Sequence, residues 1–249
     1  MTKILLSGCF GKMGRVIADC VQGRNDCTIV AGIDVSTGTA AFPVFSSFAD
    51  CTAKADVVID FSHPSCLSPL LEYCRAHRLP AVIATTGFSP EQVTAIHAAA
   101  TAIPIFFSAN MSIGIAMLTA LAKKAAAVLG TDFDIEIVEK HHNQKLDAPS
   151  GTAMMLADAL KSVREGQTEF VFERHSVRQK RRTEEIGISS VRGGTIVGEH
   201  DVIFAGHDEV ITLSHSAQSK EIFAVGAVNA ARFLAGQAPG LYDMTAMMA

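Results

Sequence analysis

The sequence has no tryptophan, only two tyrosines and a charged fraction of only 18%, and these shortages narrow the class of protein. Disordered chains and coiled coils are rich in charged residues, whereas 49% of this chain is hydrophobic. No apolar run reaches the roughly 20 residues that a membrane-spanning helix needs. The start MTKILLSG leads straight into a glycine turn and leaves no room for a secretory signal. We therefore expect a globular protein of the cytoplasm.

A strong excess of positive charge is also absent, because the formal net charge is −4 at pH 7. This balance argues against a protein that binds nucleic acid in general. One local basic run stands beside two glutamates and comprises Arg174, Arg178, Lys180, Arg181 and Arg182. We interpret it as a solvated loop, and the alternative is that it attracts an anionic substrate.

Zinc-binding patterns are missing as well. The six cysteines are Cys9, Cys20, Cys27, Cys51, Cys66 and Cys74. They form no C-x-x-C pair, and no histidine stands at zinc-finger spacing from them. Because disulfides are unusual in a reducing compartment, we expect buried or incidental free thiols. The sequence predicts no metal site.

What the chain does have, from Lys3 to about Phe107, is a regular alternation of short apolar runs with segments of helical pattern. The predicted strands are Ile4–Ser7, Thr28–Ile33, Val57–Phe61, Ala81–Ala84 and Ile105–Phe107, and the predicted helices are Lys12–Val21, Pro64–Ala76 and Pro90–Ala100. This order is typical of an α/β protein with a Rossmann-like doubly wound parallel sheet. In such a sheet the ligand lies beyond the carboxyl ends of the strands.

The pattern changes after Asn110, where a second, α+β domain is predicted. Its expected helices are Ile113–Leu129 and about Thr152–Val163, with a strand over Phe133–Glu139 between them. A mostly antiparallel sheet is predicted by the later apolar runs, which are Ile186–Val191, Thr195–Val197, Val202–Ala205 and Val210–Ser214. Helical periodicity returns over Ile222–Leu234. We expect residues 1–112 with about 220–249 to form one domain, and 113–219 the other.

A glycine-rich turn follows the first predicted strand and reads Gly8-Cys9-Phe10-Gly11-Lys12-Met13-Gly14. Small residues let a backbone turn tightly and approach a pyrophosphate, whose charge is attracted by the helix N-terminus that follows. The turn departs from the G-x-G-x-x-G pattern, because Phe10 holds the place before Gly11. An ordinary strand–turn–helix connection is therefore the alternative.

Asp34 strengthens the dinucleotide interpretation, because it ends the second predicted strand about twenty residues further on. An acid at that position accepts hydrogen bonds from the adenosine ribose hydroxyls. The same carboxylate repels a 2′-phosphate, and the next residue, Val35, offers no cation to offset it. NADH is therefore favoured, while Lys12 keeps the use of NADPH open.

A second polar cluster places His141, His142 and Lys145 between a predicted strand and the helix expected from Thr152. Histidine transfers protons near neutral pH, and lysine supplies a positive charge or a proton. The start of a helix can present N–H groups to an anion. The cluster predicts a site that binds a carboxylate and protonates a neighbouring atom. The alternatives are a metal site, for which adjacent histidines lack the usual spacing, and a merely solvated loop.

The segment 139–152 reads EKHHNQKLDAPSGT and resembles the E-x-H-H-x-x-K-x-D-A-P-S-G-T signature of the dihydrodipicolinate reductase family. The likeness covers nearly the whole chain and includes TTG at 85–87, SANMS at 108–112, EIGI at 185–188, SVRGG at 190–194, VGEH at 197–200 and GLYDM at 240–244. It implies a nicotinamide-dependent reductase of 4-hydroxy-tetrahydrodipicolinate, or dihydrodipicolinate, in diaminopimelate and lysine biosynthesis. It also implies a homotetramer built through the sheet of the second domain.

The resemblance implies residue roles as well. His141 would be the acid/base residue and Lys145 the proton donor, while His142, Gly151 and Thr152 would bind the substrate in the second domain. The first domain would bind the cofactor through Gly8, Cys9, Phe10, Gly11, Lys12, Met13, Asp34, Ala84, Thr85, Thr86, Ser108, Ala109, Asn110 and Met111. Three positions depart from the usual family residues, namely Ala84 for Gly, Lys12 for Arg and Met111 for Phe.

Two other functions stay open at this point. Another two-domain nicotinamide oxidoreductase, such as an amino-acid or sugar dehydrogenase, would share the glycine turn without H-H-x-x-K followed by S-G-T. A nicotinamide-sensing binding protein would bind the cofactor without turnover, and it leaves His141 and Lys145 unexplained.

Overall fold

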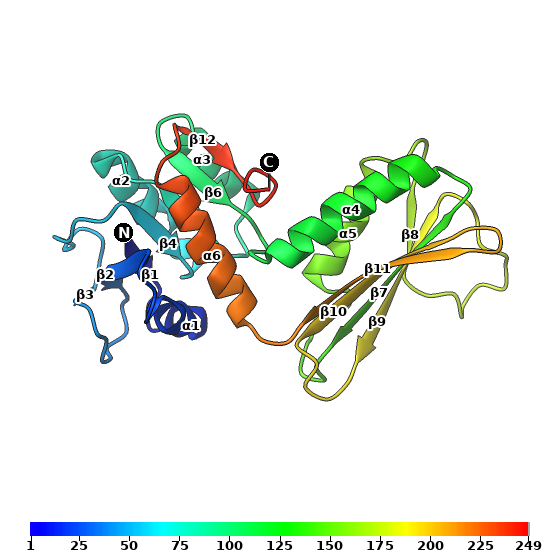
Figure 1. Ribbon diagram of the computed structural model, residues 1–249, viewed down its shortest axis with the longest axis horizontal. Coiled ribbons are helices and arrows are strands. Elements are labelled where there is room, and N and C mark those ends of the chain that lie inside the picture. Colours follow the sequence, from blue (N-terminus) through cyan, green and yellow to red (C-terminus); the bar gives the residue numbers. More distant parts are fainter. Residues whose placement is uncertain (249) are drawn as a thin grey trace. The chain divides into compact units, whose positions relative to one another are not determined.

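The computed structural model describes residues 1–248 and divides the chain into two compact units. Unit 1 comprises Met1–Ile113 together with the chain from Glu221 onward, and unit 2 comprises Gly114–Lys220. Each unit combines one sheet with helices (Figure 1). Among the described residues, no helix is long and apolar enough to cross a membrane.

The sheet of unit 1 is parallel throughout. Its strands are β1 (Thr2–Ser7), β2 (Cys27–Ile33), β3 (Val44–Phe45), β4 (Val57–Asp60), β5 (Ala81–Ile83), β6 (Pro104–Phe107) and β12 (Gly240–Tyr242). They lie in the order β12-β6-β5-β4-β1-β2-β3. After β1 the chain adds β2 and β3 on one side, and then β4, β5, β6 and β12 on the other. The direction changes between β1 and β4, and sheets of this kind bind ligands at the carboxyl ends of the two strands at such a point.

Helices connect most of these strands, whereas loops join β2 to β3 and β3 to β4. The helices are α1 (Lys12–Val21), the short 3-10 helix η1 (Pro64–Cys66), α2 (Leu67–His77), α3 (Pro90–Ala99) and α6 (Glu221–Leu234). A capping box starts α3, because the Ser89 side chain accepts from Gln92 N–H and the Gln92 side chain accepts from Ser89 N–H. The apolar face of α6 packs on α1 and on β4 and β5, so the end of the chain covers the sheet that its start forms (Figure 1).

Unit 2 is a five-stranded sheet with two helices packed on it. Its elements are α4 (Ile113–Leu129), which starts at the boundary between the units, β7 (Asp134–His141), α5 (Gly151–Lys161), β8 (Glu169–Val171), β9 (Glu185–Arg192), β10 (Gly198–Ala205) and β11 (Val210–Ala217). Buried residues alternate along β7 and β10, as expected for strands with one covered face. Ile137 and Phe204 on that face join Leu118 of α4 and Leu156 of α5 in one core.

The predicted fold class is confirmed, and several details of unit 2 are different. The strand order β11-β10-β7-β9-β8 contains two antiparallel and two parallel pairings, so this sheet is mixed and not mostly antiparallel. The crossover through α5 carries the chain from β7 to β8, and β9 then pairs in parallel between them, which apolar runs alone do not reveal. Thr195–Val197 is a turn, and β7 continues to His141, two residues past the predicted end.

Three strands lie outside the predicted elements: β3, β8 and β12, each of only two or three residues. Each is an edge strand, and edge strands need little apolar pattern because only one side is paired. The predicted helix Pro64–Ala76 is η1 followed by α2, and α2 extends to His77.

Gly226, in the middle of α6, tests the packing of unit 1. A Cβ built on it would lie 1.7 Å from the carbonyl oxygen of Met111. Glycine to alanine in a helix normally stabilises by about 1 kcal/mol, whereas here we expect Gly226→Ala to destabilise by at least ~2 kcal/mol because a backbone must move. Thermal unfolding measures it, with the partly exposed Val225→Ala on the same helix as control. A higher melting temperature for Gly226→Ala would contradict this packing.

Candidate active site

The glycine turn lies at the carboxyl end of β1, beside the end of β4. Gly8 has a φ of +78°, and a Cβ on it would lie 2.3 Å from the carbonyl oxygen of Phe61. A Cβ on Gly14 would lie 2.1 Å from the carbonyl oxygen of Gly8. Only glycines permit this closeness. Helix α1 begins after Gly11 without a side-chain cap, which leaves its first N–H groups for a ligand.

Asp34 follows β2 and is bonded to the glycine turn. One carboxylate oxygen accepts from Phe10 N–H at 2.8 Å, and the other accepts from Ser36 N–H at 2.9 Å. A carboxylate can accept about four hydrogen bonds, so two acceptor positions are left for ribose hydroxyls. The turn and Asp34 line one cavity of about 460 Å³, together with Ser46, Ser47, Phe48, His63 and other residues. The predicted pyrophosphate and ribose residues are therefore brought together.

Cys9 in the turn and Arg15 in α1 have roles that the pattern does not show. The Cys9 thiol is buried against Gly32, and burial, followed by the charge of Asp34, raises the thiol pKa to about 11. Only the backbone of Cys9 is therefore suited to bind a cofactor. Arg15 donates from Nε to the carbonyl oxygen of Phe10 at 3.0 Å and lies 5.9 Å from the centre of the Phe10 ring. Arg15 is therefore an additional cation beside the glycine-rich turn. The sequence prediction did not include it, because Arg15 lies in the first turn of helix α1.

Ala84 and Thr85 leave the carboxyl end of β5 and are anchored to β4. The N–H of Ala84 donates to the carbonyl oxygen of Asp60, and Thr85 Oγ1 donates to the Asp60 carboxylate at 2.6 Å. Ser62 donates to the same carboxylate at 2.6 Å. Burial raises the pKa of Asp60, and these hydroxyl groups oppose that change. Thr86, by contrast, is exposed.

Residues 108–111 follow β6 and form a tight turn. Ser108 Oγ donates to the carbonyl oxygen of Asn110 at 2.7 Å, and Asn110 Oδ1 accepts from Ser112 N–H at 2.8 Å. Ala109 is exposed at its tip. Met111 is 2% exposed, so its side chain belongs to the core and only its backbone can reach a cofactor.

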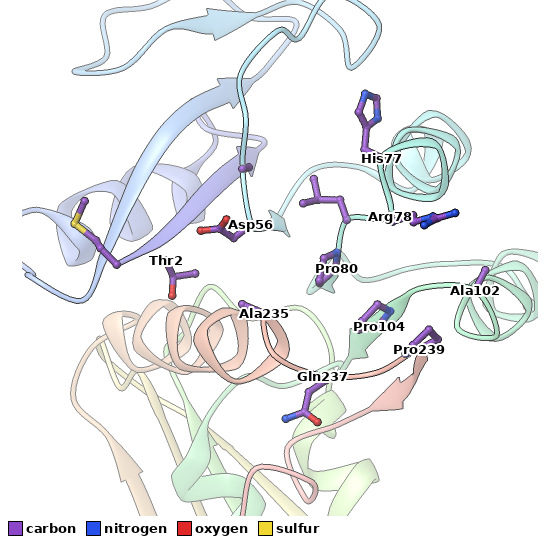
Figure 2. A pocket seen from close by; sticks show the side chains of 13 residues that line it. Thr2, Asp56, His77, Arg78, Pro80, Ala102, Pro104, Ala235, Gln237 and Pro239 are labelled. Atoms are coloured by element: carbon purple, nitrogen blue, oxygen red, sulfur yellow. The ribbon is translucent and has the colours of Figure 1, made fainter.

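Unit 1 has a larger hollow of about 710 Å³ at the opposite, amino-terminal edge of its sheet (Figure 2). Thr2, Asp56, Pro80 and Pro104 line it where β1, β4, β5 and β6 begin. Ligands of parallel α/β sheets bind beyond the carboxyl ends of the strands. The smaller cavity at the glycine turn is therefore the better candidate for a cofactor.

In unit 2, His141 is held by a buried carboxylate. His141 Nδ1 lies 2.6 Å from Oε2 of Glu139, whose side chain is fully buried. Arg192 donates from Nη1 and Nη2 to the two oxygens of Glu139, at 2.8 Å each. Burial acts to raise the pKa of Glu139, but hydrogen bonds from Arg192, Ser190 and His141 outweigh it and lower that pKa to about 2. Glu139 is therefore ionised and fixes the ring of His141 by accepting from Nδ1.

The start of α5 lies against the same cluster. Ser150 caps the helix by accepting from Ala153 N–H, while its own N–H donates to Glu139 at 3.1 Å. His200 Nε2 lies 3.1 Å from Ser150 Oγ, and burial, followed by repulsion from His141, lowers the pKa of His200 to about 4. The cap places Gly151 and Thr152 in the first turn of α5, directly after Ser150, which is bonded to the same Glu139 as His141.

Lys145 and His142 complete this cluster. Lys145 Nζ lies 2.9 Å from Oδ1 of Asp147, and this bond lowers the pKa of the Asp147 carboxyl. The N–H of Lys145 donates to the carbonyl oxygen of His142, so both residues belong to one short turn. Unit 2 therefore brings together all five residues predicted for catalysis and substrate binding. Glu139 and Arg192 were missed as site residues, although both stand in the motifs that carry the resemblance.

Three of the five residues of the basic run form ion pairs within unit 2. Arg174 and Arg181 bind Glu136 of β7, and Arg182 binds Glu185 and Glu169. All five residues lie in the loop between β8 and β9, as predicted, and Arg174 and Arg182 are exposed although they are paired. The charge of the three paired residues is compensated within the sheet, which removes most of the support for substrate attraction.

Comparison with known proteins decides the family. Residues 2–111 match the family model of the dihydrodipicolinate reductase N-terminus, and residues 114–248 match that of its C-terminus. The chain belongs to the dihydrodipicolinate reductase family. Enzymes named 4-hydroxy-tetrahydrodipicolinate reductase are 52% identical in Caldanaerobacter subterraneus subsp. tengcongensis, covering 98% of this chain and 97% of that one, and 49% identical in Clostridium tetani, covering 100% and 97%.

A solved structure supports the same family. The dipicolinate-bound dihydrodipicolinate reductase of Paenisporosarcina sp. TG-14 is 27% identical, with a TM-score of 0.82 and coverage of 98% of this chain and 97% of that one. The diaminopimelate dehydrogenase of C. glutamicum, at 14% identity and a TM-score of 0.59, shares the fold. The expected enzyme class and reaction are confirmed: the dihydrodipicolinate reductase family reduces 4-hydroxy-tetrahydrodipicolinate with a nicotinamide dinucleotide.

Thr85 and Thr86 provide a matched test of the Asp60 network. Thr85→Val removes a donor to the buried carboxylate and the acceptor of Ser62 N–H, so we expect a loss of about 2–4 kcal/mol in stability. Thr86→Val, at an exposed position, should change it by no more than ~0.5 kcal/mol. Thermal unfolding of both variants measures the difference. Equal melting temperatures would show that the bonds to Asp60 contribute little.

Proposed function

We propose that this chain reduces its cyclic dicarboxylate substrate with His141 and Lys145 as the proton-transfer residues. His142, Gly151 and Thr152 bind the substrate carboxylates. The reduced nicotinamide supplies the hydride. The observation that carries this assignment is the hydrogen-bonded cluster of Glu139, His141 and Arg192 next to the start of α5.

The geometry of His141 supports acid/base chemistry at one nitrogen. Because Nδ1 is bonded to Glu139, the proton-transferring atom is Nε2. Gly198 lies beside it, since a Cβ built there would come within 3.1 Å of His141 Nε2. Glu139 also stabilises the imidazolium that forms when His141 takes up a proton.

Lys145 and the start of α5 provide positive charge for an anionic substrate. Asp147 holds the Lys145 ammonium at 2.9 Å and is itself 58% exposed, so a substrate carboxylate can replace it as the partner of Lys145. The first-turn N–H groups of a helix bind anions, and Gly151 adds no side chain there. These features suit a substrate with two carboxylates.

Lys145→Ala tests the assignment. We expect turnover to fall by ~100-fold or more, because a positioned proton donor contributes about that much, while NADH binding stays within about twofold. The assay generates the substrate in situ and follows NADH and NADPH absorbance separately, with the exposed Lys124→Ala of α4 as control. Loss of NADH binding equal to the loss of turnover would contradict the role of Lys145. Absence of oxidation of either cofactor by the wild type would overturn the proposed function.

We propose NADH as the preferred cofactor. Asp34 keeps two acceptor positions for ribose hydroxyls, and its negative charge repels a 2′-phosphate. Val35, 87% exposed, offers no cation beside it. Lys12 and Arg15 are the cations of the turn, and they leave some use of NADPH.

Asp34→Asn removes the charge and keeps an acceptor oxygen for the glycine turn. We expect the ratio of kcat/KM for NADPH to that for NADH to rise by about 10-fold or more, because a like-charge contact near the surface costs more than 1 kcal/mol. Steady-state kinetics with both cofactors measure the ratio. Glu91→Gln, at an exposed carboxylate of α3, is the control. An unchanged ratio would show that Asp34 does not select the cofactor.

We further propose a homotetramer in the cytoplasm. The sheet of unit 2 supports the assembly, because its edge strand β11 and the end of β9 expose Val210, Ile211 and Val191.

A further inference from the structure

Two chains of hydrogen bonds in unit 2 start from one guanidinium, that of Arg192. Arg192 is the last residue of β9 and stands opposite His141 in the parallel register of β7 and β9. Its Nη1 and Nη2 donate to both oxygens of Glu139 at 2.8 Å. Nη2 also donates to the carbonyl oxygen of Asp147 at 2.6 Å.

Each of these acceptors leads to one proton-transfer residue. Glu139 accepts from His141 Nδ1 at 2.6 Å, and Asp147 holds Lys145 Nζ at 2.9 Å. We propose that Arg192 is the positioning residue that sets the geometry of His141 and Lys145 together. The proposal rests on the roles given to these two residues in the proposed function.

The shape of the arginine side chain suits this task. Its planar fork binds both oxygens of a carboxylate and keeps further N–H groups for a third acceptor, which an ammonium cannot do in the same geometry. The backbone after Arg192 ties the same loop. Gly193 N–H donates to the carbonyl oxygen of His141, and Asn143 N–H donates to that of Gly194. The turn that carries His142 and Lys145 is thus fixed to the end of β9.

Removal of the guanidinium has a predictable effect on Glu139. The groups that face this buried carboxylate are Arg192 and Ser190 from β9, His141 from β7, Ser150 N–H at α5 and His200 from β10. Without the largest of the lowering contributions, burial is opposed only by Ser190, His141 and Ser150 N–H, so the pKa of Glu139 rises. Glu139 then takes up a proton at a higher pH than in the wild type, and a protonated carboxyl no longer stabilises the His141 imidazolium.

The experiment compares Arg192→Met and Arg192→Lys with the wild type, and uses Arg174→Met as the matched control. Arg174 also binds two carboxylates of β7 and β9, but at the other end of these strands. For each protein, kcat and KM are measured from pH 5 to 9, NADH binding by fluorescence and folding by thermal unfolding.

We expect Arg192→Met to lower kcat at pH 8 by ~30-fold or more, since both proton-transfer residues lose their orientation. Its NADH dissociation constant should stay within about twofold of the wild-type value. As the pH is lowered, its kcat should also fall at a higher pH than that of the wild type, in which Glu139 stays ionised from pH 5 to 9. Arg192→Lys keeps the charge, so it should restore the wild-type acid side while kcat stays reduced by ~10-fold.

Wild-type kcat and pH profile in Arg192→Met would overturn the proposal, as would an equal loss of kcat in Arg174→Met. Should Arg192→Met not fold, Arg192→Lys decides, because wild-type kcat in that variant also contradicts positioning by the fork. His141→Ala and Lys145→Ala separate the two levels of the argument. If they lose turnover and the Arg192 variants do not, only the role of Arg192 is wrong; if they also keep turnover, the proposed function of the site fails.

Discussion

The bond between Glu139 and Arg192 is the constraint on which the arrangement of unit 2 depends. A carboxylate taken out of water is costly unless hydrogen bonds and an opposite charge compensate it. Glu139 has both, because Arg192, His141 and Ser150 N–H occupy its oxygens. The residues that compensate the charge are thereby fixed in place. The hydrogen bonds that compensate the buried charge also orient His141 and hold Ser150, the N-cap residue of α5.

Unit 1 solves the same problem without a cation. Asp60 is buried at the end of β4, and its oxygens accept from hydroxyl groups that include those of Ser62 and Thr85. Hydroxyls compensate a charge less than a guanidinium does, so burial raises the pKa of Asp60 while that of Glu139 is lowered. Asp60 therefore serves to hold the loop after β5 against the loop after β4. Together with Gly8 it shapes the edge of the sheet at which such folds bind a dinucleotide.

The sequence predicts the elements and motifs of this protein better than the connections between them. The helices over Lys12–Val21 and Ile113–Leu129 follow from local periodicity, and the structure has them with the same bounds. Cross-strand bonds join residues about fifty positions apart, and no local pattern encodes such pairs. Arg192 stands in a quoted motif, yet nothing in SVRGG says that its partner is Glu139. The sequence also predicts a loop at His141, whereas His141 is the last residue of β7. The apolar alternation of β7 ends before the strand does.

The two parallel strands β7 and β9 show how much such distant pairs decide. A hairpin cannot join parallel strands. In this pair, arginine side chains also link the two strands near both ends. At one end Arg174 binds Glu136 of β7 and Glu185 of β9; at the other Arg192 of β9 binds Glu139 of β7. Arginine side chains bind all three carboxylates, those of Glu136, Glu185 and Glu139. Of the three, Glu139 also binds a histidine. The end of this strand pair that we propose to be functional therefore differs by one further hydrogen bond, from His141 Nδ1 to Glu139.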